Sequence, residues 1–531
     1  MSLADQALTY ARFLQGLPRY LGHTLTLPEA QAAIRARLDE RDARLVATAR
    51  KLVFEYEHSP YRPLLELAGC TFADFAALVR AHGVEAALGD LREAGVYFTF
   101  EEYKGRAPVV RRGREIRVEE WQFDNPYLAY YFRTSTSGST GRPTPTSTGL
   151  AHLAVQTELR MALLDAHHAL GYPVAIWRPA LPSASGLNNV LRQARMGRNA
   201  VRWFTPLVPG QYRPALKYRM ATGAAVLVGR LCGHRLPRPE PVPLDDAARV
   251  ARTLADLAAR DGGAVLSTTV SCGLRVAAAA GAAGLPLTKV FLLVAGEPPT
   301  TAKVRGMRAS GATVVTDYGA AEMGRVALGC AAAGDGDPTD MHVATDVCAI
   351  VPFPREVPES GEVVPSLHFT SVVETMPKIL FNLELDDFGD VEERGCACPL
   401  EGLGLRTHLR GVRSFRKLVG EGVTLVGGDM IRVLEEVLPA RFGGTPLDYQ
   451  LIEDEDERGF TRLSLRVSPR LPIADAGAIV TEMLEALRRT SVAADLARAY
   501  WQAAGSFRIV REDPIVSPRG KQMPLKVMRR G

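Results

Sequence analysis

The stretch from residue 264 to residue 317 constrains the fold more than any other part of the sequence. Short runs rich in Val, Ile and Leu alternate there with Ala-rich runs of helical length: Ala264–Val270, Leu274–Ala283, Lys289–Val294, Ala302–Ser310 and Thr313–Asp317. Wholly apolar strands separated by helices are typical of a sheet that is buried on both faces. The sequence therefore predicts an α/β fold, with a large domain built on buried mixed or parallel sheets.

The two ends of the chain carry other patterns. From Leu8 to about Leu91 apolar residues recur at helical spacing, which predicts a helical opening segment. Near the C-terminus, short apolar strands and amphipathic helices predict a small α+β domain: Val423–Val426, Met430–Leu438, Leu463–Val467 and Ala474–Arg489. We therefore expect a helical N-terminal part of the large domain over residues 1–125, a core over 126–410 and a small domain over 411–531.

Composition excludes several functional classes. A net charge of +5 over 531 residues is too dilute to indicate a nucleic-acid surface. The N-terminus lacks the apolar core of an export signal, and the longest apolar runs are shorter than the roughly 20 residues of a membrane span. Seven cysteines without dense spacing are typical of a reducing compartment. We expect a cytoplasmic protein that binds neither nucleic acid nor membrane, and the sequence leaves homodimerisation open.

A polar loop before the alternating stretch is the first candidate site. It contains Thr136, Ser137, Gly138, Ser139, Thr140, Gly141 and Thr144. The glycines let successive backbone N–H groups converge, and the hydroxyl groups add donors, which favours phosphate binding. The Gly-Lys-Ser/Thr ending of a Walker loop is missing. By composition alone a plain flexible loop is the commoner interpretation.

The loop is one of several motifs that resemble a known superfamily in the same order. Thr136–Thr144 looks like the phosphate-binding motif of the adenylate-forming enzymes, the acyl-CoA ligase and luciferase superfamily, and its Pro143-Thr144 is similar to the phenylacetate-CoA ligase branch. Ala295–Pro298 resembles the Gly-Glu turn, Asp317–Glu322 the Tyr-Gly-x-Thr-Glu motif with Ala321 for Thr, and Leu385–Gly389 the Thr-Gly-Asp-x-Gly motif. The resemblance covers about residue 45 to the end.

The resemblance implies a role for each matching residue in binding ATP. The loop would wrap the β- and γ-phosphates, Tyr318 would stack on adenine, and Asp387 would accept hydrogen bonds from the ribose, with Asp386 a near-equal candidate. Glu322 would be both a catalytic residue and the carboxylate ligand of Mg²⁺, which prefers oxygen donors. Other residues expected to contact the nucleotide are Gly296, Glu297, Asp317 and Gly319.

Two basic residues of the small domain complete the implied catalytic set. Arg413 lies where the superfamily has a hinge arginine, although Phe415 and Arg416 replace the acidic pair that usually follows. Ser517–Lys521 resembles the Pro-Arg-x-x-Gly-Lys ending, shortened by two residues. A lysine on a mobile lid could bridge the carboxylate and the α-phosphate as charge develops. We assign this role to Lys521, with Lys526 as the alternative and a solvated basic tail as the non-catalytic interpretation.

Cysteine and histidine residues form a second constellation, which resembles segments of some phenylacetate-CoA-ligase-like proteins. Cys330, His342, Cys396 and Cys398 would close a tetrahedral Cys₃His site for a structural Zn²⁺. The alternative is a set of unpaired buried thiols. A structural metal here would brace the loops near the nucleotide without taking part in the chemistry.

These features together predict an ATP-dependent ligase that forms an acyl adenylate from an aryl or alkyl carboxylic acid and passes the acyl group to a thiol, most plausibly coenzyme A. The segment 178–189 lies where relatives line the acid pocket. A carrier-protein thiol, an amine acceptor and nitrite-dependent diazotisation are alternatives within the enzyme class. The altered motifs also allow a nucleotide-binding homologue without turnover.

Overall fold

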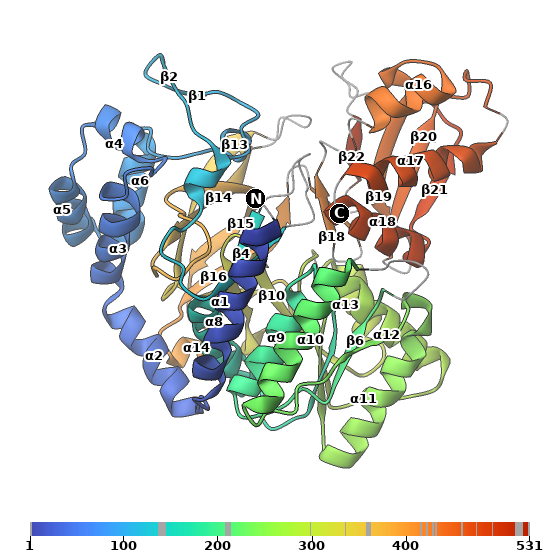
Figure 1. The fold of residues 1–531 in the computed structure, drawn as a ribbon, viewed down its shortest axis with the longest axis horizontal. Helices are drawn as coiled ribbons and strands as arrows, with labels where there is room; N and C mark the ends of the chain where they lie inside the picture. The colour runs from blue at the N-terminus through green and yellow to red at the C-terminus, as the bar shows by residue number, and fades with distance from the viewer. Residues whose placement is uncertain are drawn as a thin grey trace.

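The structure is a computed structural model, shown in Figure 1. It describes residues 3–135, 145–207, 214–297, 299–334, 336–356, 363–414, 417–420, 423–426, 430, 433–457, 460–473, 475–490, 492–515 and 524–528. The predicted phosphate loop from Thr136 to Thr144 and the predicted catalytic residue Lys521 lie outside these ranges. None of the helices in the described part of the chain is long and apolar enough to cross a membrane.

A sheet of twelve strands forms the centre of the large domain, in the order β13-β14-β15-β16-β12-β11-β10-β9-β8-β5-β6-β7. Its strands are β5 (Val174–Trp177), β6 (Arg202–Thr205), β7 (Pro239–Pro241), β8 (Ala264–Thr268), β9 (Val290–Val294), β10 (Thr313–Ala320), β11 (Gly324–Gly329), β12 (Met341–Val343), β13 (Cys348–Glu356), β14 (Val363–Ser371), β15 (Leu383–Glu393) and β16 (Thr407–Ser414). From β10 to β7 the pairing is parallel, whereas β10 pairs with β11 in the antiparallel sense. Strand β10 therefore joins a parallel half to an antiparallel half.

The parallel half confirms the predicted alternation of strands and helices. The helices that accompany it are α8 (Leu150–Ala166), α9 (Ser185–Arg195), α10 (Leu216–Leu231), η3 (Leu244–Asp246), α11 (Ala247–Asp261), α12 (Val270–Ala282) and α13 (Thr301–Arg308). Strand β8 is buried at all five positions and ends two residues earlier than predicted. The reason is that the Thr269 side chain accepts a hydrogen bond from the Cys272 backbone N–H and so starts α12 at Val270.

The opening segment is helical, as predicted, and covers the antiparallel half (Figure 1). Its elements are α1 (Leu3–Leu21), α2 (Leu27–Asp39), α3 (Arg41–Ala49), η1 (Arg50–Phe54), α4 (Arg62–Ala68), α5 (Phe72–His82), α6 (Val84–Glu93), α7 (Phe100–Tyr103), β1 (Val109–Arg111), β2 (Arg114–Ile116), η2 (Glu120–Phe123), β3 (Tyr131–Ser135) and β4 (Pro145–Gly149). Tyr61 packs edge-on against Phe98, Phe123 and Phe381, which joins these helices to the sheet.

The C-terminal part contains a separate sheet of four strands in the order β21-β20-β19-β22, drawn in orange and red in Figure 1. Its elements are η5 (Val433–Val437), α16 (Leu438–Phe442), η6 (Pro446–Asp448), β19 (Tyr449–Glu455), β20 (Thr461–Val467), α17 (Ala476–Thr490), α18 (Val492–Ala504), β21 (Phe507–Val510) and β22 (Leu525–Val527). The hairpin of β17 (Lys417–Gly420) and β18 (Val423–Val426) precedes them, after β16. Strand β16 belongs to the large sheet up to Ser414. The boundary expected at residue 411 therefore lies within this strand.

A buried lysine connects the large domain to the small sheet. Lys303 on α13 is 2% exposed, and its Nζ lies 3.0 Å from a Glu455 carboxylate oxygen on β19. The same Nζ donates to the Thr461 hydroxyl oxygen on β20 at 3.2 Å, and the Thr300 hydroxyl donates to Glu455 at 2.9 Å. This contact is buried and hydrogen-bonded on several sides, and it links the large domain to the small sheet.

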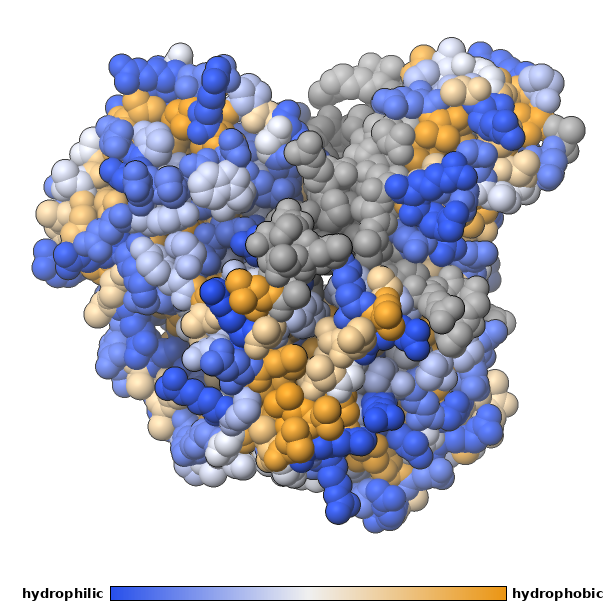
Figure 2. All heavy atoms as spheres, in the orientation of Figure 1, coloured by the Kyte–Doolittle hydropathy of each residue, from blue (hydrophilic) through white to orange (hydrophobic). Residues whose placement is uncertain are grey.

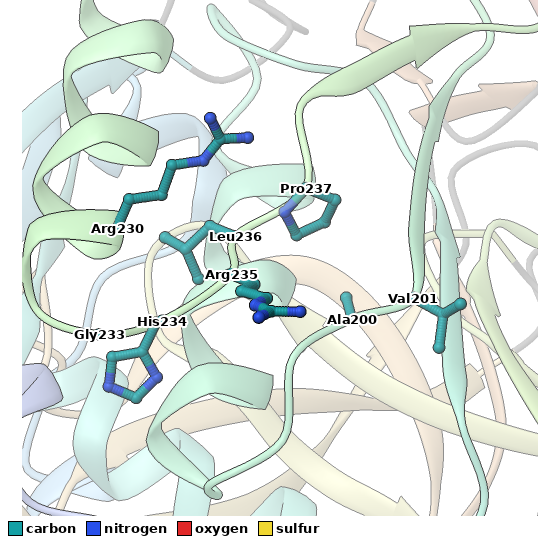
Figure 3. A pocket seen from close by; sticks show the side chains of 8 residues that line it. All are labelled: Ala200, Val201, Arg230, Gly233, His234, Arg235, Leu236 and Pro237. Atoms are coloured by element: carbon teal, nitrogen blue, oxygen red, sulfur yellow. The ribbon is translucent and has the colours of Figure 1, made fainter.

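Two surface features lie on and beside α10. Leu216, Met220, Leu227 and Leu231 are between 58% and 79% exposed on this helix. Figure 2 shows an apolar area in the lower centre, where Figure 1 places α10. A pocket at the end of α10 is lined by Ala200, Val201, Arg230, Gly233, His234, Arg235, Leu236 and Pro237 (Figure 3). It contains none of the residues predicted to bind ATP, metal or the acid.

Candidate active site

Tyr318 and Asp387 meet at the junction strand of the large sheet. Tyr318 lies near the end of β10, and its hydroxyl donates to a carboxylate oxygen of Asp387 on β15 at 2.7 Å. The Ser414 hydroxyl, at the end of β16, donates to the other oxygen of the same carboxylate. Burial and then the neighbouring Asp387 raise the pKa of Tyr318 well above its usual range.

The structure separates the two adjacent aspartates that the sequence left as near-equal candidates. Asp387 contacts Tyr318 and Ser414, whereas Asp386 lies 3.9 Å from the Arg355 guanidinium. Consecutive strand residues point to opposite faces. Only Asp387 is therefore on the same side as Tyr318.

Gly319 is required by packing in this motif. A Cβ built on Gly319 would lie 2.1 Å from the Gly324 carbonyl oxygen and 2.7 Å from the Arg325 Cα on β11. The strand register also shifts between Tyr318 and Gly319, which forms a bulge. The glycine lets β10 and β11 approach closely, and the bulge lies directly after Tyr318.

Glu322 follows β10 in the turn to β11, and its side chain is 12% exposed. One of its oxygens lies 3.8 Å from Lys104 Nζ, which also lies 3.2 Å from Glu120. Burial lowers the pKa of Lys104, and the two glutamates oppose that shift. A single accessible carboxylate fits Mg²⁺, because this ion takes one or two protein carboxylates together with phosphate oxygens. Sequence reasoning missed Lys104, which no motif marks.

The turn after β9 contains Gly296 and Glu297, and the Glu297 side chain contacts the start of α12. Gly296 has a φ of +93°, and the Glu297 carboxylate accepts from the backbone N–H of Ser271 at 3.3 Å and from the Ser271 hydroxyl. The carboxylate also lies 4.0 Å from Lys303 Nζ. Glu297 is thus held at the N-terminus of α12, in contact with the lysine that reaches the small sheet.

Asp317 faces away from Tyr318, and two arginines contact one of its carboxylate oxygens. One of its oxygens accepts from Arg160 Nη2 at 2.8 Å and from Arg325 Nε at 2.6 Å. Burial alone would raise the pKa of Asp317, but Arg160 and Arg325 outweigh it and lower that pKa. The structure therefore pairs Asp317 with arginines, which differs from the direct nucleotide contact expected from the sequence.

The basic residues of the C-terminal part are described in part. Arg413 is exposed and pairs with Phe388 in the β15–β16 ladder, next to Ser414 and Asp387. Lys526 lies on edge strand β22, opposite Ile452. Arg413 therefore precedes Ser414 in β16, and Lys526 belongs to the small sheet.

The predicted metal ligands come together. The ligand atoms of Cys330, His342, Cys396 and Cys398 all lie within 4.8 Å of one another. His342 Nε2 is 3.4 Å from the Cys396 sulfur and 3.0 Å from the Cys398 sulfur, while its Nδ1 is 2.7 Å from the Leu405 carbonyl oxygen. That second contact places the proton on Nδ1 and leaves Nε2 as a ligand, which is how metal-binding histidines are oriented.

A neighbouring group extends this cluster. Asp340, His408 and Cys330 also lie within 4.8 Å of one another. The His408 Nδ1 is 2.7 Å from an Asp340 oxygen, and the His342 and His408 rings are 4.1 Å apart. Because Asp340 is already bonded to His408, the Cys₃His set remains the simpler tetrahedral site.

The predicted α/β fold with a separate small C-terminal domain is confirmed. The structure is similar over 96% of its length to 92% of a 2-hydroxyisobutyryl-CoA ligase solved in complex with 2-HIB-AMP and CoA, with 16% identity and a TM-score of 0.53. At this identity the likeness shows the fold alone.

Two further solved structures align with lower TM-scores. A mutant of the amide bond synthetase Mcba from Marinactinospora thermotolerans aligns over 92% of this chain and 93% of its own, with 13% identity and a TM-score of 0.44. An o-succinylbenzoate CoA synthetase from Bacillus subtilis aligns over 86% and 92%, with 13% identity and a TM-score of 0.43. No protein-family model and no curated protein sequence matches the chain.

Proposed function

We propose that the protein is an ATP-dependent ligase that activates a carboxylic acid as an acyl adenylate and then transfers the acyl group to a thiol. A carboxylate oxygen attacks the α-phosphorus of ATP, and the bond to the bridging oxygen breaks to release pyrophosphate. The thiol sulfur then attacks the acyl carbonyl, loses its proton and displaces AMP. Coenzyme A is the acceptor we favour; a carrier-protein thiol, an amine and nitrite-dependent diazotisation are the alternatives.

The observation that carries this proposal is the contact of Tyr318 and Ser414 with Asp387 at the junction strand. An aromatic face beside a carboxylate that already accepts two hydroxyl hydrogens suits an adenosine, whose ribose offers two hydroxyl donors. In the proposal Glu322 holds Mg²⁺, which neutralises phosphate charge, and Arg413 contacts the ribose side of the nucleotide. The loop around Gly138 and the side chain of Lys521 supply the phosphate and transition-state contacts.

Pyrophosphate exchange with adjacent aspartate variants tests this proposal. We expect wild type to incorporate labelled pyrophosphate into ATP with at least one acid of a broad aromatic, aliphatic and amino acid panel. Asp387→Asn should raise the KM for ATP about tenfold or more, since a charged acceptor is lost from two hydrogen bonds. Asp386→Asn is the matched control, because Asp386 faces Arg355 instead, and its KM for ATP should stay near that of wild type.

Two outcomes would contradict the proposal. ATP binding without exchange across the whole panel would favour the nucleotide-binding homologue without turnover. Equal effects of Asp387→Asn and Asp386→Asn would remove the ribose role from Asp387. Adding coenzyme A or hydroxylamine to the exchange mixture, and identifying the product by mass, distinguishes thiol from amine acceptors.

We also propose that Cys330, His342, Cys396 and Cys398 hold a structural Zn²⁺. The convergence of three sulfurs on His342 Nε2 supports this assignment. The site would tie the end of β11 to the segment before β16, and so steady the two strands that lead away from Tyr318 and towards Arg413.

Metal content tests the zinc assignment. The purified protein should carry about one zinc per chain, and the double variant Cys396→Ser, Cys398→Ser should lose it, because a structural site needs four ligands. Cys70→Ser, Cys232→Ser is the matched control, since these cysteines lie outside the cluster. Equal metal content in both double variants would exclude this ligand set.

A further inference from the structure

Helix α10 carries a large share of the exposed apolar side chains. Of the thirteen large apolar residues that are exposed in the described part of the chain, four lie on this one helix: Leu216, Met220, Leu227 and Leu231. Their spacing places all four along one side of the helix. Figure 2 shows an apolar area where Figure 1 places α10. Grouped apolar residues on a surface mark a site of contact with another molecule.

The charge around α10 is positive. The stretch 166–239, which contains α9, α10 and the pocket at the end of α10, has eleven Lys and Arg residues and not one Asp or Glu. The whole protein has a net charge of only +5, so the rest of the chain is net negative. By helical spacing, exposed Lys217 flanks the apolar side of α10 on one edge, and exposed Arg219 and Arg230 flank it on the other.

The pocket at the end of α10 arises where the chain turns back on the helix. Gly233 has a φ of +87°, and a Cβ on Gly229 would lie 2.2 Å from a methyl carbon of Leu236, so both glycines permit this turn. Leu236 is 1% exposed, and the pocket has a volume of about 530 Å³. The Nε2 of His234 lies 3.1 Å from the Leu21 carbonyl oxygen on α1, which holds the imidazole in place.

Two arginines line this pocket without a counter-charge (Figure 3). The guanidinium groups of Arg230 and Arg235 form no ion pair and no hydrogen bond with the residues that the structure describes. Glu240, the first acidic residue after them in the sequence, is in ion pairs with Arg202 and Arg249. Two guanidinium groups beside an apolar floor suit a phosphate group carried by an apolar molecule, because arginine binds phosphate through paired donors.

The pocket lies away from the candidate active site. Val201 precedes β6 and Pro237 precedes β7, so the pocket is at the amino ends of these strands. Tyr318 lies towards the carboxyl end of β10, which runs parallel to them through β9, β8 and β5. The two sites are therefore at opposite ends of the parallel strands, and a molecule bound at α10 leaves the Tyr318 side open.

Charge and side-chain type distinguish the molecules that this surface could bind. A second copy of the chain would bring Lys217, Arg219 and Arg230 against the same surface, and like charges in contact repel. The residues that dominate protein–protein contacts are mostly Trp, Tyr and Arg, with Leu under-represented, whereas three of the four apolar residues here are Leu. Leu beside Lys and Arg on one helix surface is typical of segments that lie in the interface of an anionic bilayer.

We propose that α10 and the adjoining pocket dock the protein on the surface of an anionic phospholipid bilayer. The apolar side of α10 enters the boundary between headgroups and acyl chains, and Arg230 and Arg235 donate hydrogen bonds to a headgroup phosphate in the pocket. This differs from the absence of membrane contact expected from composition, because an interfacial helix requires neither a spanning apolar run nor a large net charge. The inference is independent of the proposed adenylating function.

Sedimentation with lipid vesicles tests the docking. The full chain should bind vesicles made of equal parts of phosphatidylcholine and phosphatidylglycerol at least about tenfold more tightly than vesicles of phosphatidylcholine alone, because several basic residues face the lipid. Added salt should weaken this binding, since the charges involved are exposed. Wild-type protein that remains in the supernatant with both kinds of vesicle would overturn the proposal.

Substitution of the apolar residues tests their insertion. The double variant Leu227→Ser, Leu231→Ser should bind the phosphatidylglycerol vesicles about tenfold or more weakly than wild type, because it removes apolar groups from the lipid. The matched control is Val363→Ser, Leu447→Ser, which changes two residues of similar exposure on other elements and should bind as wild type does. Equal binding by both double variants would exclude insertion of α10. Unchanged thermal unfolding midpoints show that the variants are folded.

Substitution of the arginines tests the headgroup contact. Arg230→Gln, Arg235→Gln should weaken binding to the same vesicles about tenfold or more and reduce its dependence on salt. The control is Arg80→Gln, Arg114→Gln, which removes two exposed positive charges from other elements and should have little effect. If both pairs weaken binding equally, general charge attracts the lipid and the pocket has no part in it.

Three further measurements assign the surface to another molecule if the proposal is wrong. A dimer by light scattering that Leu227→Ser, Leu231→Ser converts to a monomer would identify a second copy as the occupant. Binding to polyglutamate without binding to vesicles, lost in Arg230→Gln, Arg235→Gln, would identify an acidic protein. Binding of free glycerol phosphate without binding to vesicles would leave a site for small phosphates. Each of these results would overturn docking on a bilayer, and none of them depends on pyrophosphate exchange.

Discussion

The two sides of strand β10 balance their charges in different ways. On the Tyr318 side, two hydroxyl groups satisfy the carboxylate of Asp387. On the Asp317 side, one carboxylate is shared by two arginines. Neighbouring residues of one strand therefore border one carboxylate held by neutral hydroxyl groups and another held by arginines. We associate the first with the nucleotide.

We expect the largest effect on the free energy of unfolding when each carboxylate is removed in turn. Asp317→Asn should lower the free energy of unfolding by about 3–5 kcal/mol, because it leaves buried arginines without a counter-charge. Asp387→Asn should cost about 1 kcal/mol, since its partners are neutral hydroxyl groups. Urea unfolding measures both, and equal losses would break the comparison.

Acid titration sharpens the same prediction. The pKa of Asp317 is lower in the folded protein than in the unfolded chain, so its stabilisation is present above the unfolded pKa of about 3.9 and is lost as the pH falls through the folded pKa. The stability difference between wild type and Asp317→Asn should therefore be constant near neutral pH and shrink in acid below about pH 4. A difference that grew in acid would contradict the assigned ion pairs.

The next prediction concerns the source of positive charge on the Tyr318 side of β10. If the small domain supplies it through Lys521, Lys521→Ala should reduce adenylate formation at least about a hundredfold, as loss of one transition-state donor does. Single-turnover formation of acyl adenylate measures this step. Loss of activity in Lys526→Ala with full activity in Lys521→Ala would move the role to Lys526.

The smallest effects separate the contribution of the Tyr318 ring to ATP binding from that of its hydroxyl group. Tyr318→Ala should raise the KM for ATP about tenfold, because stacking of a base on an aromatic ring is worth about 1–3 kcal/mol. Tyr318→Phe keeps the ring and should change that KM by less than about fivefold, the value of one hydrogen bond. If Tyr318→Phe is as defective as Tyr318→Ala, the hydroxyl and not the ring binds the nucleotide.

The sequence predicted the parallel half of the sheet better than the antiparallel half. Apolar strands such as β8 and β9 are buried on both faces and alternate with helices, so composition alone marks them. Strand β15 contains Glu384, Asp386 and Asp387 in buried positions, and such residues predict turns or surface when seen singly. Their partners, including Arg355 and Ser414, come from distant segments that only the fold brings together.

The sequence likewise predicted some residues of the candidate site and missed others. The motif resemblance marked Tyr318, Asp387 and the four candidate metal ligands, and the structure brings each group together. It also assigned Asp317 to the nucleotide, whereas the structure pairs Asp317 with Arg160 and Arg325. Arg160 was missed because a lone arginine in a helix usually reaches the surface, and its burial depends on the helix that packs over it.

The close approach of β10 and β11 at Gly319 limits which substitutions the chain tolerates beside Tyr318. A side chain at that position would collide with the backbone of the next strand, and a Cβ on Gly324 would meet His152 and Gln156. Libraries that vary the residues around Tyr318 should therefore keep both glycines fixed.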